Sequence, residues 1–187
     1  MKNIAILASH NGSGFDAIYK AINDKVLNAN IALLISNNST ALALKNASSY
    51  GIERFLVNET TDINTDEEIY RLLKKYKCHY VFLSGYMKKL SPLLTSDFYI
   101  INAHPSLLPR HGGAGMYGRF VHEAVINSKD KKSGITIHEV NAIYDDGKII
   151  LQKELVVADD ETVESLEAKI KKLEKIAIIE ALKQCLK

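Results

Sequence analysis

The fold is set by the stretch IAILASHNGSGFDAIYKAINDKV, residues 4–26. It opens with a short apolar run, residues 4–8, which predicts a buried strand. A glycine-containing turn follows at residues 9–14, and the residues after it repeat apolar side chains with helical spacing: Phe15, Ile18, Ile22 and Val26. A buried strand, a tight turn and an amphipathic helix are the first two elements of a βαβ unit.

The same alternation continues to about residue 100. Further strands are expected at 31–35, 55–57, 80–83 and 100–102, with helices at 41–49 and 67–76 between them. Repeated β-α-β spacing favours a parallel sheet with helices on both faces. The carboxyl ends of all these strands then meet at one edge, where such folds bind ligands.

The pattern changes after residue 104. We expect a glycine-rich loop at 105–118, a helix at 120–127, and strands at 135–138 and 149–157 around the turn 145–147. A long amphipathic helix at 162–186 has the apolar set Val163, Leu166, Ile170, Leu173, Ile176, Ala177 and Leu182. We therefore predict an α/β fold, a Rossmann-like three-layer sandwich with a mostly parallel sheet, a C-terminal β-hairpin-like extension and a long C-terminal helix. The 187 residues suit a single domain, 1–187.

Composition narrows the classes of partner. Lys and Arg (24) exceed Asp and Glu (22) by two, so the charge of +2 gives no broad footprint for nucleic acid. No apolar run is long enough to cross a bilayer, so no membrane partner is expected. Cys78 and Cys185 are far apart and the histidines lack ligand spacing, so we expect no disulfide framework, no metal and a cytoplasmic location.

The glycine-rich turn at residues 9–14 suits an anion. Backbone N–H groups at a helix N-terminus with little side-chain bulk around them bind phosphate. Gly12-x-Gly14-x-x-Ala17 also fits the loose dinucleotide pattern, but the second strand ends in Ser36-Asn37-Asn38 without the carboxylate that would hold a ribose. The turn therefore favours a phosphate monoester over NAD as its ligand. The alternative interpretation is a tight turn with a purely structural role.

The segment Asn102-Ala103-His104-Pro105-Ser106-Leu107-Leu108-Pro109 begins where the fifth strand ends. Strand alternation puts Asn102 and His104 on the same side of the chain, and the prolines keep the exit extended. Acyl transfer to an amine needs a donor for the tetrahedral oxyanion and a group that moves a proton. An amide beside an imidazole provides both, although a lone His before Pro is also compatible with a structural role.

Three motifs together resemble the phosphoribosylglycinamide formyltransferase (glycinamide ribonucleotide transformylase) family. They are residues 11–13, Gly85-Tyr86-Met87-Lys88-Lys89-Leu90-Ser91-Pro92, and residues 102–109, in family order over nearly the whole chain. The segments 113–118 and 121–125 are similar to one branch of that family. The resemblance implies transfer of the formyl group of 10-formyltetrahydrofolate to 5'-phosphoribosylglycinamide in de novo purine biosynthesis, with small-molecule partners and a monomer or homodimer.

The resemblance also implies the catalytic residues. Asn102 and His104 match the pair that contacts the formyl oxygen and handles the proton. The third member is an Asp seven residues after a His, which gives Asp145 after His138, with Asp146 as the competitor. A carboxylate close to His104 is expected to raise the pKa of the imidazole and favour its protonated form.

Substrate-binding residues follow in the same way. The family's phosphate turn implies Gly12, Ser13 and Gly14, and Gly14 stands where an Asn is usual. Two residues of the last helix, Lys171 and Glu174, match positions near the ribonucleotide, and a solvated helix face is the alternative for both. The expected division is a phosphate- and ribonucleotide-binding half, 1–100, and a catalytic and folate-binding half, 101–187.

The implied folate-binding residues are Met87, Lys88, Lys89, Leu90, Asn102 and His138. Lys88 stands where Arg is usual and lacks a bidentate fork for a carboxylate. Lys89 places a charge where an apolar contact is common. His111 and His122, in and after the glycine-rich loop, are further candidates to line the site, whereas His10 and His79 are expected at the surface.

Two alternative functions lie within the same superfamily, and two belong to other classes of protein. Methionyl-tRNA formyltransferase is expected to have a further C-terminal domain and a more basic surface than a charge of +2 provides. Formyltetrahydrofolate deformylase is expected to have an N-terminal regulatory domain. A dinucleotide-dependent dehydrogenase is opposed by the missing ribose carboxylate, and a non-catalytic ligand sensor by the proton-transfer groups.

Overall fold

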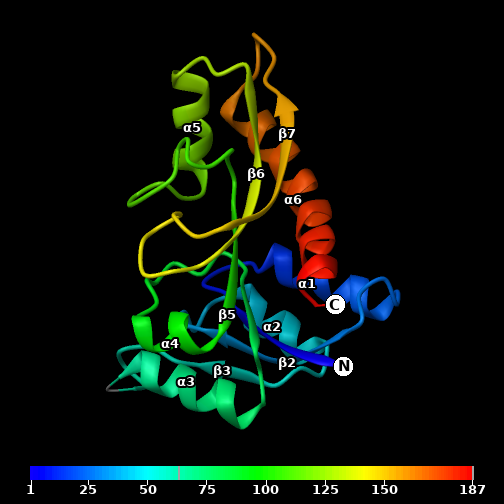
Figure 1. Ribbon diagram of the computed structural model, residues 1–187, viewed down its shortest axis with the longest axis vertical. Helices are drawn as coiled ribbons and strands as arrows, with labels where there is room; N and C mark the ends of the chain where they lie inside the picture. The colour runs from blue at the N-terminus through cyan, green and yellow to red at the C-terminus, as the bar shows by residue number, and fades with distance from the viewer. Residues whose placement is uncertain (63, 187) are drawn as a thin grey trace.

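The computed structural model describes residues 1–62 and 64–186, and these residues form one seven-stranded sheet (Figure 1). The strands lie in the order β3-β2-β1-β4-β5-β6-β7. The first five run parallel to one another, whereas β6 is antiparallel to β5 and to β7. Their bounds are β1 Lys2–Leu7, β2 Ala29–Ser36, β3 Arg54–Leu56, β4 Tyr80–Leu83, β5 Tyr99–His104, β6 Lys132–Glu139 and β7 Ile149–Val156. The predicted mostly parallel sheet with a hairpin-like extension is confirmed.

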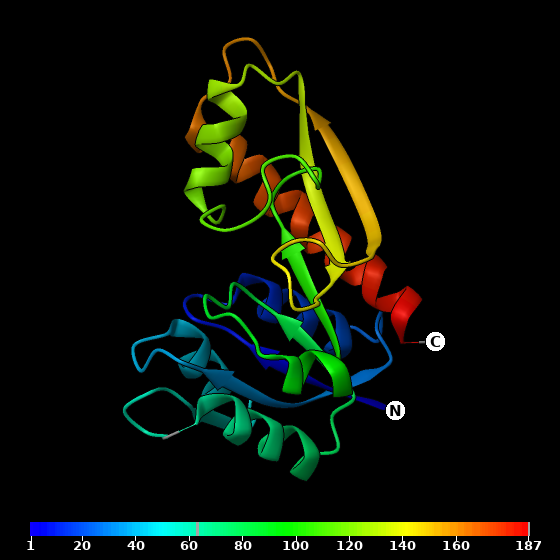
Figure 2. The same cartoon turned by 60° about the vertical axis from the view of Figure 1, so that its left-hand side comes forward.

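Helices cover both faces of the sheet, as expected for three layers. One apolar cluster joins Ile4 and Ile6 of β1 to α1, α2, α5 and α6, and the other joins Ala5 and Leu7 to α3 and α4. Neighbouring residues of β1 enter different clusters because side chains alternate along a strand. Figure 2 shows α3 and α4 on the other side of the strands from α6. The bounds are α1 Ser13–Asn23, α2 Leu42–Ser49, α3 Thr65–Lys75, α4 Pro92–Asp97, α5 Arg119–Asn127 and α6 Val163–Cys185.

Three expectations about the helices are wrong. The six-residue helix α4 was not expected, because it is too short to show a helical period. Val26 lies beyond the end of α1 and is 47% exposed, since the chain leaves the helix at Asp24 and takes a left-handed conformation at Lys25. Ile176 is 54% exposed because the buried stripe of α6 runs through Ile170 and Ala177, and position 176 falls about 100° to one side of it.

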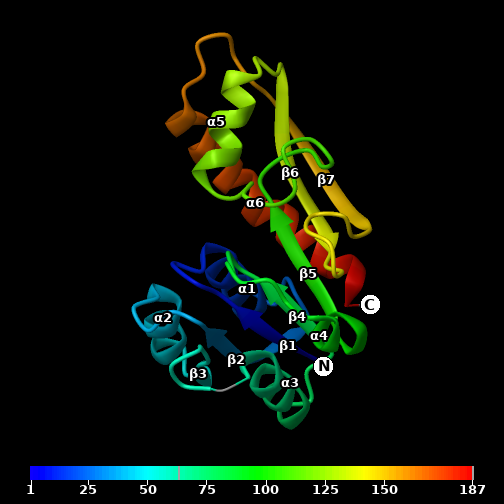
Figure 3. The same ribbon diagram turned by 90° about the vertical axis from the view of Figure 1, so that its left-hand side faces the viewer.

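Strand β5 carries two of the candidate residues, Asn102 and His104. Figure 3 shows β5 running from the part of the molecule that holds β1–β4 to the part that holds β6 and β7. Ile101 faces the cluster beneath α6, so Asn102 and His104 project from the opposite face. The register pairs Asn102 with His138 and His104 with Thr136, which brings four polar residues to one face.

Among the residues described, no helix has both the length and the apolar character that crossing a bilayer requires. The C-terminal end of α6 lies near the start of β1 (Figures 1 and 2), and Lys2 and Cys185 line the same surface hollow.

Candidate active site

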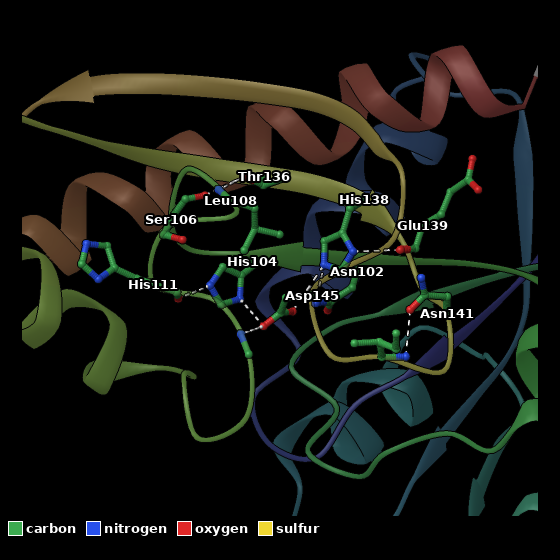
Figure 4. A network of polar contacts seen from close by, with 12 residues as sticks. Asn102, His104, Ser106, Leu108, His111, Thr136, His138, Glu139, Asn141 and Asp145 are labelled. Carbon is green, nitrogen blue, oxygen red and sulfur yellow. Dashed lines mark hydrogen bonds and ion pairs between the residues drawn. The ribbon is translucent and has the colours of Figure 1, made fainter.

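Asn102 and His138 form the first contact of the site. Asn102 Nδ2 lies 3.2 Å from His138 Nε2 (Figure 4). The other ring nitrogen, His138 Nδ1, lies 2.8 Å from the carbonyl oxygen of Glu139, so Nδ1 carries a proton. In the neutral ring Nε2 therefore accepts a hydrogen bond from Asn102. The amide of Asn102 keeps a second N–H that can face a substrate oxygen.

His104 lies between two oxygen atoms. Its Nε2 is 2.8 Å from the carbonyl oxygen of His111, and its Nδ1 is 3.4 Å from Oδ2 of Asp145. The side chain of His104 is 4% exposed and that of Asp145 is 11% exposed. An imidazole and a carboxylate are thus held together in a largely desolvated pocket, the arrangement that general acid–base catalysis uses.

Asp145, and not Asp146, is brought beside His104. Gly147 passes so close to the Glu139 carbonyl oxygen that a Cβ there would lie 1.7 Å from it. This close approach forms the turn after β6, and Asp145 adopts a positive φ of 55° within it. Its carboxylate points inward, whereas Asp146 is exposed and accepts a 3.4 Å hydrogen bond from Asn141.

The electrostatics correct one expectation. Burial lowers the pKa of His104 below its usual range and outweighs the Asp145 carboxylate and the His111 carbonyl, which act in the opposite direction. For Asp145, burial opposes ionisation, but contact with His138, the charge of His104 and the N–H of Gly113 together lower its pKa. The expected rise in the pKa of His104 is therefore wrong, because desolvation of the imidazolium is the larger effect. The ligand-free pair is a neutral imidazole beside a carboxylate, ready to accept a proton.

A second polar network holds the loop that follows β5. Thr136 Oγ1 donates to the Ser106 carbonyl at 2.7 Å and accepts the N–H of Leu108 at 3.0 Å. Gln152 Nε2 donates both to this hydroxyl and to the Leu108 carbonyl, each at 2.9 Å. Thr136 is fully buried, so the loop is fixed to β6 directly after His104 (Figure 4).

The phosphate turn has the geometry that the sequence predicts for an anion site. Gly12 is the residue before α1 and has a φ of 71°, and no side chain caps the helix. Phe15 N donates to Ser84 Oγ at 3.0 Å, which leaves the first-turn N–H groups of Ser13 and Gly14 without a partner in the described chain. A Cβ at Gly14 would lie 3.0 Å from Phe82 and 3.1 Å from Ile178 and Ser84. A side chain at position 14 would therefore require its neighbours to move by a few tenths of an ångström, and this turn offers backbone donors.

The stretch that is expected to bind folate, residues 87–90, lies beside the turn between β1 and α1. The N–H of Met87 donates to Ser9 Oγ at 2.8 Å. Met87 is 40% exposed and Leu90 is buried. Lys88 pairs with Glu59 at 3.0 Å, and both side chains are exposed. The amino group of Lys89 lies 5.3 Å from the ring centre of Tyr144, so the stretch also meets the loop that holds Asp145.

The positions on α6 have contrasting environments. Lys171 is exposed and pairs with Glu167, one turn earlier on the same helix. Burial raises the pKa of Glu174 to about 7, although Lys171 and Lys175 oppose this shift. His122 of α5 is 3% exposed, and its Nδ1 has no partner in the described chain. Burial lowers the pKa of His122, and the charges of Lys171 and His104 act in the same direction, whereas Glu167 opposes them. His122 thus lies on the side of the site where α5 and α6 meet.

Gly113 and Asp130 were not anticipated, whereas His111 was a candidate to line the site. Gly113 N donates to Asp145 Oδ2 at 2.9 Å, and His111 Nε2 lies 2.7 Å from Asp130 Oδ2. Gly112 is closely packed, since a Cβ there would meet Leu108 at 2.5 Å. The other glycines of the loop, Gly113, Gly115 and Gly118, have positive φ and no atom within 4 Å of a Cβ position, so Gly112 alone among the four is packed this closely. His10 and His79 are exposed, as expected.

Within residues 1–62 and 64–186, no group of three His, Cys, Asp or Glu side chains has the arrangement of a metal site. The two cysteines are free; Cys78 is buried and Cys185 half-buried.

Residues 2–182 match the formyl transferase family. The Haemophilus influenzae phosphoribosylglycinamide formyltransferase is 33% identical over 179 residues, which cover 93% of this chain and 82% of that protein. The chloroplastic phosphoribosylglycinamide formyltransferase of Arabidopsis thaliana is 35% identical, and the match covers 90% of this chain but only 60% of the plant protein.

The structural comparison agrees with the sequence comparison. The crystal structure of phosphoribosylglycinamide formyltransferase from Bacillus halodurans has a TM-score of 0.90 and 30% identity, covering 99% of this chain and 95% of that one. The similarity extends over both parts of the molecule, including the strand that bears Asn102 and His104. The chain therefore belongs to the formyl transferase family and, within it, to the phosphoribosylglycinamide formyltransferases.

Proposed function

We propose that the chain transfers the formyl group of 10-formyltetrahydrofolate to the amine of 5'-phosphoribosylglycinamide, giving formylglycinamide ribonucleotide and tetrahydrofolate in de novo purine (IMP) biosynthesis. The observation that carries this proposal is the convergence of Asn102, His104 and Asp145. His104 Nδ1 lies 3.4 Å from Asp145, and His138 lies 3.2 Å from Asn102 and 3.6 Å from Asp145. The named activity of the 33% identical relative supports the choice of substrates.

The reaction needs an oxyanion donor and one proton transfer. The amine attacks the formyl carbon, a C–N bond forms, and the carbonyl oxygen becomes an oxyanion that accepts the free N–H of Asn102. The new ammonium loses a proton to neutral His104, and the Asp145 carboxylate stabilises the resulting imidazolium. This proton then goes to the folate nitrogen as the original C–N bond breaks. The lowered pKa of His104 suits this order, because the ring must first accept a proton.

The ribonucleotide is assigned to the turn before α1. Its phosphate accepts the N–H groups of Ser13 and Gly14, which Gly12 allows to point outward, and the positive end of the helix dipole adds to the attraction. Lys171 supplies a cation and Glu174 a carboxyl group from α6. This places the nucleophilic amine between the phosphate turn and the end of β5.

The folate is assigned to the surface formed by residues 87–90 and the loop before β7. Exposed apolar side chains suit a flat aromatic ring: Met87 is 40% exposed, Ile143 63% and Tyr144 48%. Asn102 and His138 lie at the inner end of this surface, and Leu90 supports it from the core. Lys88 and Lys89 face the more polar end of the ligand.

We further propose that residues 1–187 act as one domain, in which 1–100 supply the ribonucleotide turn and 101–187 the catalytic and folate-facing residues. Residues 87–90 then serve the folate from the first half. As the sequence predicts, we propose a monomer or homodimer that acts in the cytoplasm on small molecules. Neither a nucleic-acid partner nor a metal is part of this proposal. Relatives with chloroplastic names show that other compartments host the same family.

One assay tests the proposal. The purified protein is mixed with 5'-phosphoribosylglycinamide and 10-formyltetrahydrofolate, and tetrahydrofolate formation is followed by absorbance. Release of tetrahydrofolate should require the ribonucleotide, and glycinamide without the ribose phosphate is the control. Release at the same rate without the ribonucleotide would instead identify a hydrolase and reject the proposal.

A further inference from the structure

One short backbone segment, residues 111–113, holds both members of the proton-transfer pair. The carbonyl of His111 accepts from His104 Nε2 at 2.8 Å, and the N–H of Gly113 donates to Asp145 Oδ2 at 2.9 Å. Figure 4 shows this segment lying next to both side chains. The segment therefore determines how the imidazole and the carboxylate face each other.

The His111 carbonyl also determines which nitrogen of His104 holds the proton. A carbonyl oxygen can only accept, so a 2.8 Å contact requires N–H at Nε2. The neutral ring then has its lone pair at Nδ1, 3.4 Å from Asp145 Oδ2, which is longer than an ordinary N–H···O bond. Without the carbonyl, the charged carboxylate is the stronger acceptor, and the proton of the neutral ring moves to Nδ1.

Asp130 holds this carbonyl in place. Its Oδ2 lies 2.7 Å from His111 Nε2, and the two side chains are only 12% and 16% exposed. His111 has a φ of 52°, a left-handed conformation that is uncommon for a non-glycine residue. The Ser106 hydroxyl fixes the preceding carbonyl, that of Arg110, at 2.6 Å. The contact with Asp130 fixes the ring of His111 itself.

We propose that Asp130 is a positioning residue of this active site: through the ring of His111 it fixes the His111 carbonyl, which keeps the proton of neutral His104 on Nε2 and the Nδ1 lone pair toward Asp145. Asp130 lies in the turn between α5 and β6 and touches no residue of the catalytic set. Its effect on turnover rests on the proposed formyl transfer, whereas its effect on the tautomer of His104 does not.

The alternative to a positioning role is a structural one, in which Asp130 only attaches the loop to the turn before β6. Arg110 Nη1 lies 3.5 Å from Asp130 Oδ1 and is 68% exposed, so the loop has such a surface contact as well. A structural attachment predicts a change in stability alone. The positioning role predicts a change in the ring of His104, 26 positions before Asp130 in the chain.

The test is nuclear magnetic resonance of the ligand-free protein with ¹⁵N-labelled histidine, at a pH above the titration of His104. The variants are Asp130→Ala and Asp130→Asn, and Asp159→Asn removes a neighbouring exposed ion pair, with Lys131, as the matched control. The signals of His104 are assigned from their absence in His104→Gln. Thermal unfolding of each variant shows that it folds.

Wild type and Asp159→Asn should show the Nε2–H tautomer of His104. Asp130→Ala should show a shift to the Nδ1–H tautomer, and Asp130→Asn, which can still accept from His111, should show a smaller shift. The same Nε2–H tautomer in a folded Asp130→Ala would overturn the proposal. This result is independent of whether the protein transfers formyl groups.

Kinetics provide the second measurement. Asp130→Ala should lower kcat on the order of tenfold or more while the KM for the ribonucleotide stays within about twofold, because the nitrogen acting as the base has changed. Partial recovery of kcat in Asp130→Asn supports positioning. A shifted tautomer with unchanged kcat would contradict the role of Nδ1 in turnover. An inactive wild type with the predicted tautomer shift would reject the proposed function and leave the positioning role intact.

Discussion

The turn proposed for the phosphate and the proposed catalytic centre lie at the same edge of one sheet but are built differently. The turn consists of consecutive residues, Gly12 to Gly14, and presents backbone N–H groups. The centre takes side chains from β5, β6 and the loop before β7, and a fourth segment, 111–113, aligns them. A backbone site is disturbed by adding atoms, whereas a side-chain site is disturbed by removing them. Substitutions in the two regions should therefore affect different kinetic constants.

His104→Ala tests the side-chain region most severely. It removes the proton acceptor, and we expect kcat to fall on the order of a thousandfold. The affinity for the ribonucleotide, measured by calorimetry, should stay within about twofold, because the N–H groups of the turn are untouched. Turnover close to wild type would mean that another group moves the proton.

Asp145→Asn keeps an oxygen for the N–H of Gly113 but removes the charge that faces His104. We expect kcat to fall on the order of a hundredfold, because the imidazolium formed in the reaction loses its counter-charge. Asp146→Asn is the matched control and should retain activity within about twofold. Equal losses in the two variants would show that the turn, and not the inward carboxylate, matters.

Gly12→Val tests the backbone region. The Cβ would lie 2.9 Å from the Cβ of Ala43, and φ is 71°, so the turn must shift. We expect the KM for the ribonucleotide to rise on the order of tenfold with kcat nearly retained, since each lost charge-assisted bond contributes on the order of 1–3 kcal/mol.

Gly51→Ala is the control for this backbone strain. Gly51 has a similar φ of 69° and no atom within 4 Å of its Cβ position. It should lower the free energy of unfolding by about 1 kcal/mol and leave the KM unchanged. A similar KM change in both variants would show that the effect of Gly12→Val is general destabilisation.

Glu174→Gln separates binding from stability. Burial raises the pKa of Glu174 from 4.5, its value in the unfolded chain, to about 7. The stabilisation of the folded protein by the protonated Glu174 is therefore complete below pH 4.5 and is lost as the pH rises through about 7. The variant should therefore unfold at a higher temperature than wild type above pH 7 and bind the ribonucleotide several-fold more weakly.

Glu167→Gln is the counterpart on the same helix. Its hydrogen bond with Lys171 outweighs burial and lowers the pKa of Glu167, so this carboxylate favours the folded protein once it is ionised. The substitution should not raise the melting temperature at high pH. A higher melting temperature in both variants would contradict the assigned sign for Glu174.

Lys88→Arg should have the smallest effect. Lys88 pairs with Glu59 in full contact with solvent, and such pairs contribute little. Arg restores a bidentate fork for a carboxylate, so the KM for the folate should fall by no more than about threefold. A larger decrease would indicate that the side chain at position 88 is a principal folate contact.

The sequence predicts best what depends on local periodicity. The strand, turn and helix over residues 2–23 follow from apolar spacing and glycines that are adjacent in the chain. Strand alternation alone predicts that Asn102 and His104 share a face, and the register with His138 agrees with it. Asp145 was expected from the spacing in the family and not from its local sequence. The turn geometry at Gly147, which directs the Asp145 carboxylate inward, cannot be derived from composition.

Other features depend on contacts between distant residues. The pair of His111 and Asp130 spans 19 positions and forms only because a turn brings β6 back beside the loop. The direction of the pKa shift of His104 depends on how completely it is buried, which a nearby carboxylate in the sequence does not reveal. The tight packing around Gly14 depends in part on Ile178, from the other end of the chain.

The hydroxyl of Ser9 links the two substrate regions. It donates to Asn37 at 2.6 Å and accepts from the N–H of Met87 at 2.8 Å, while the N–H of Ser9 bonds to the Gly85 carbonyl at 3.2 Å. A displacement of residues 85–87 is therefore transmitted to the start of the glycine turn. If one substrate shifts this serine, the two ligands share a coupling free energy, and each changes the affinity of the other by the same factor.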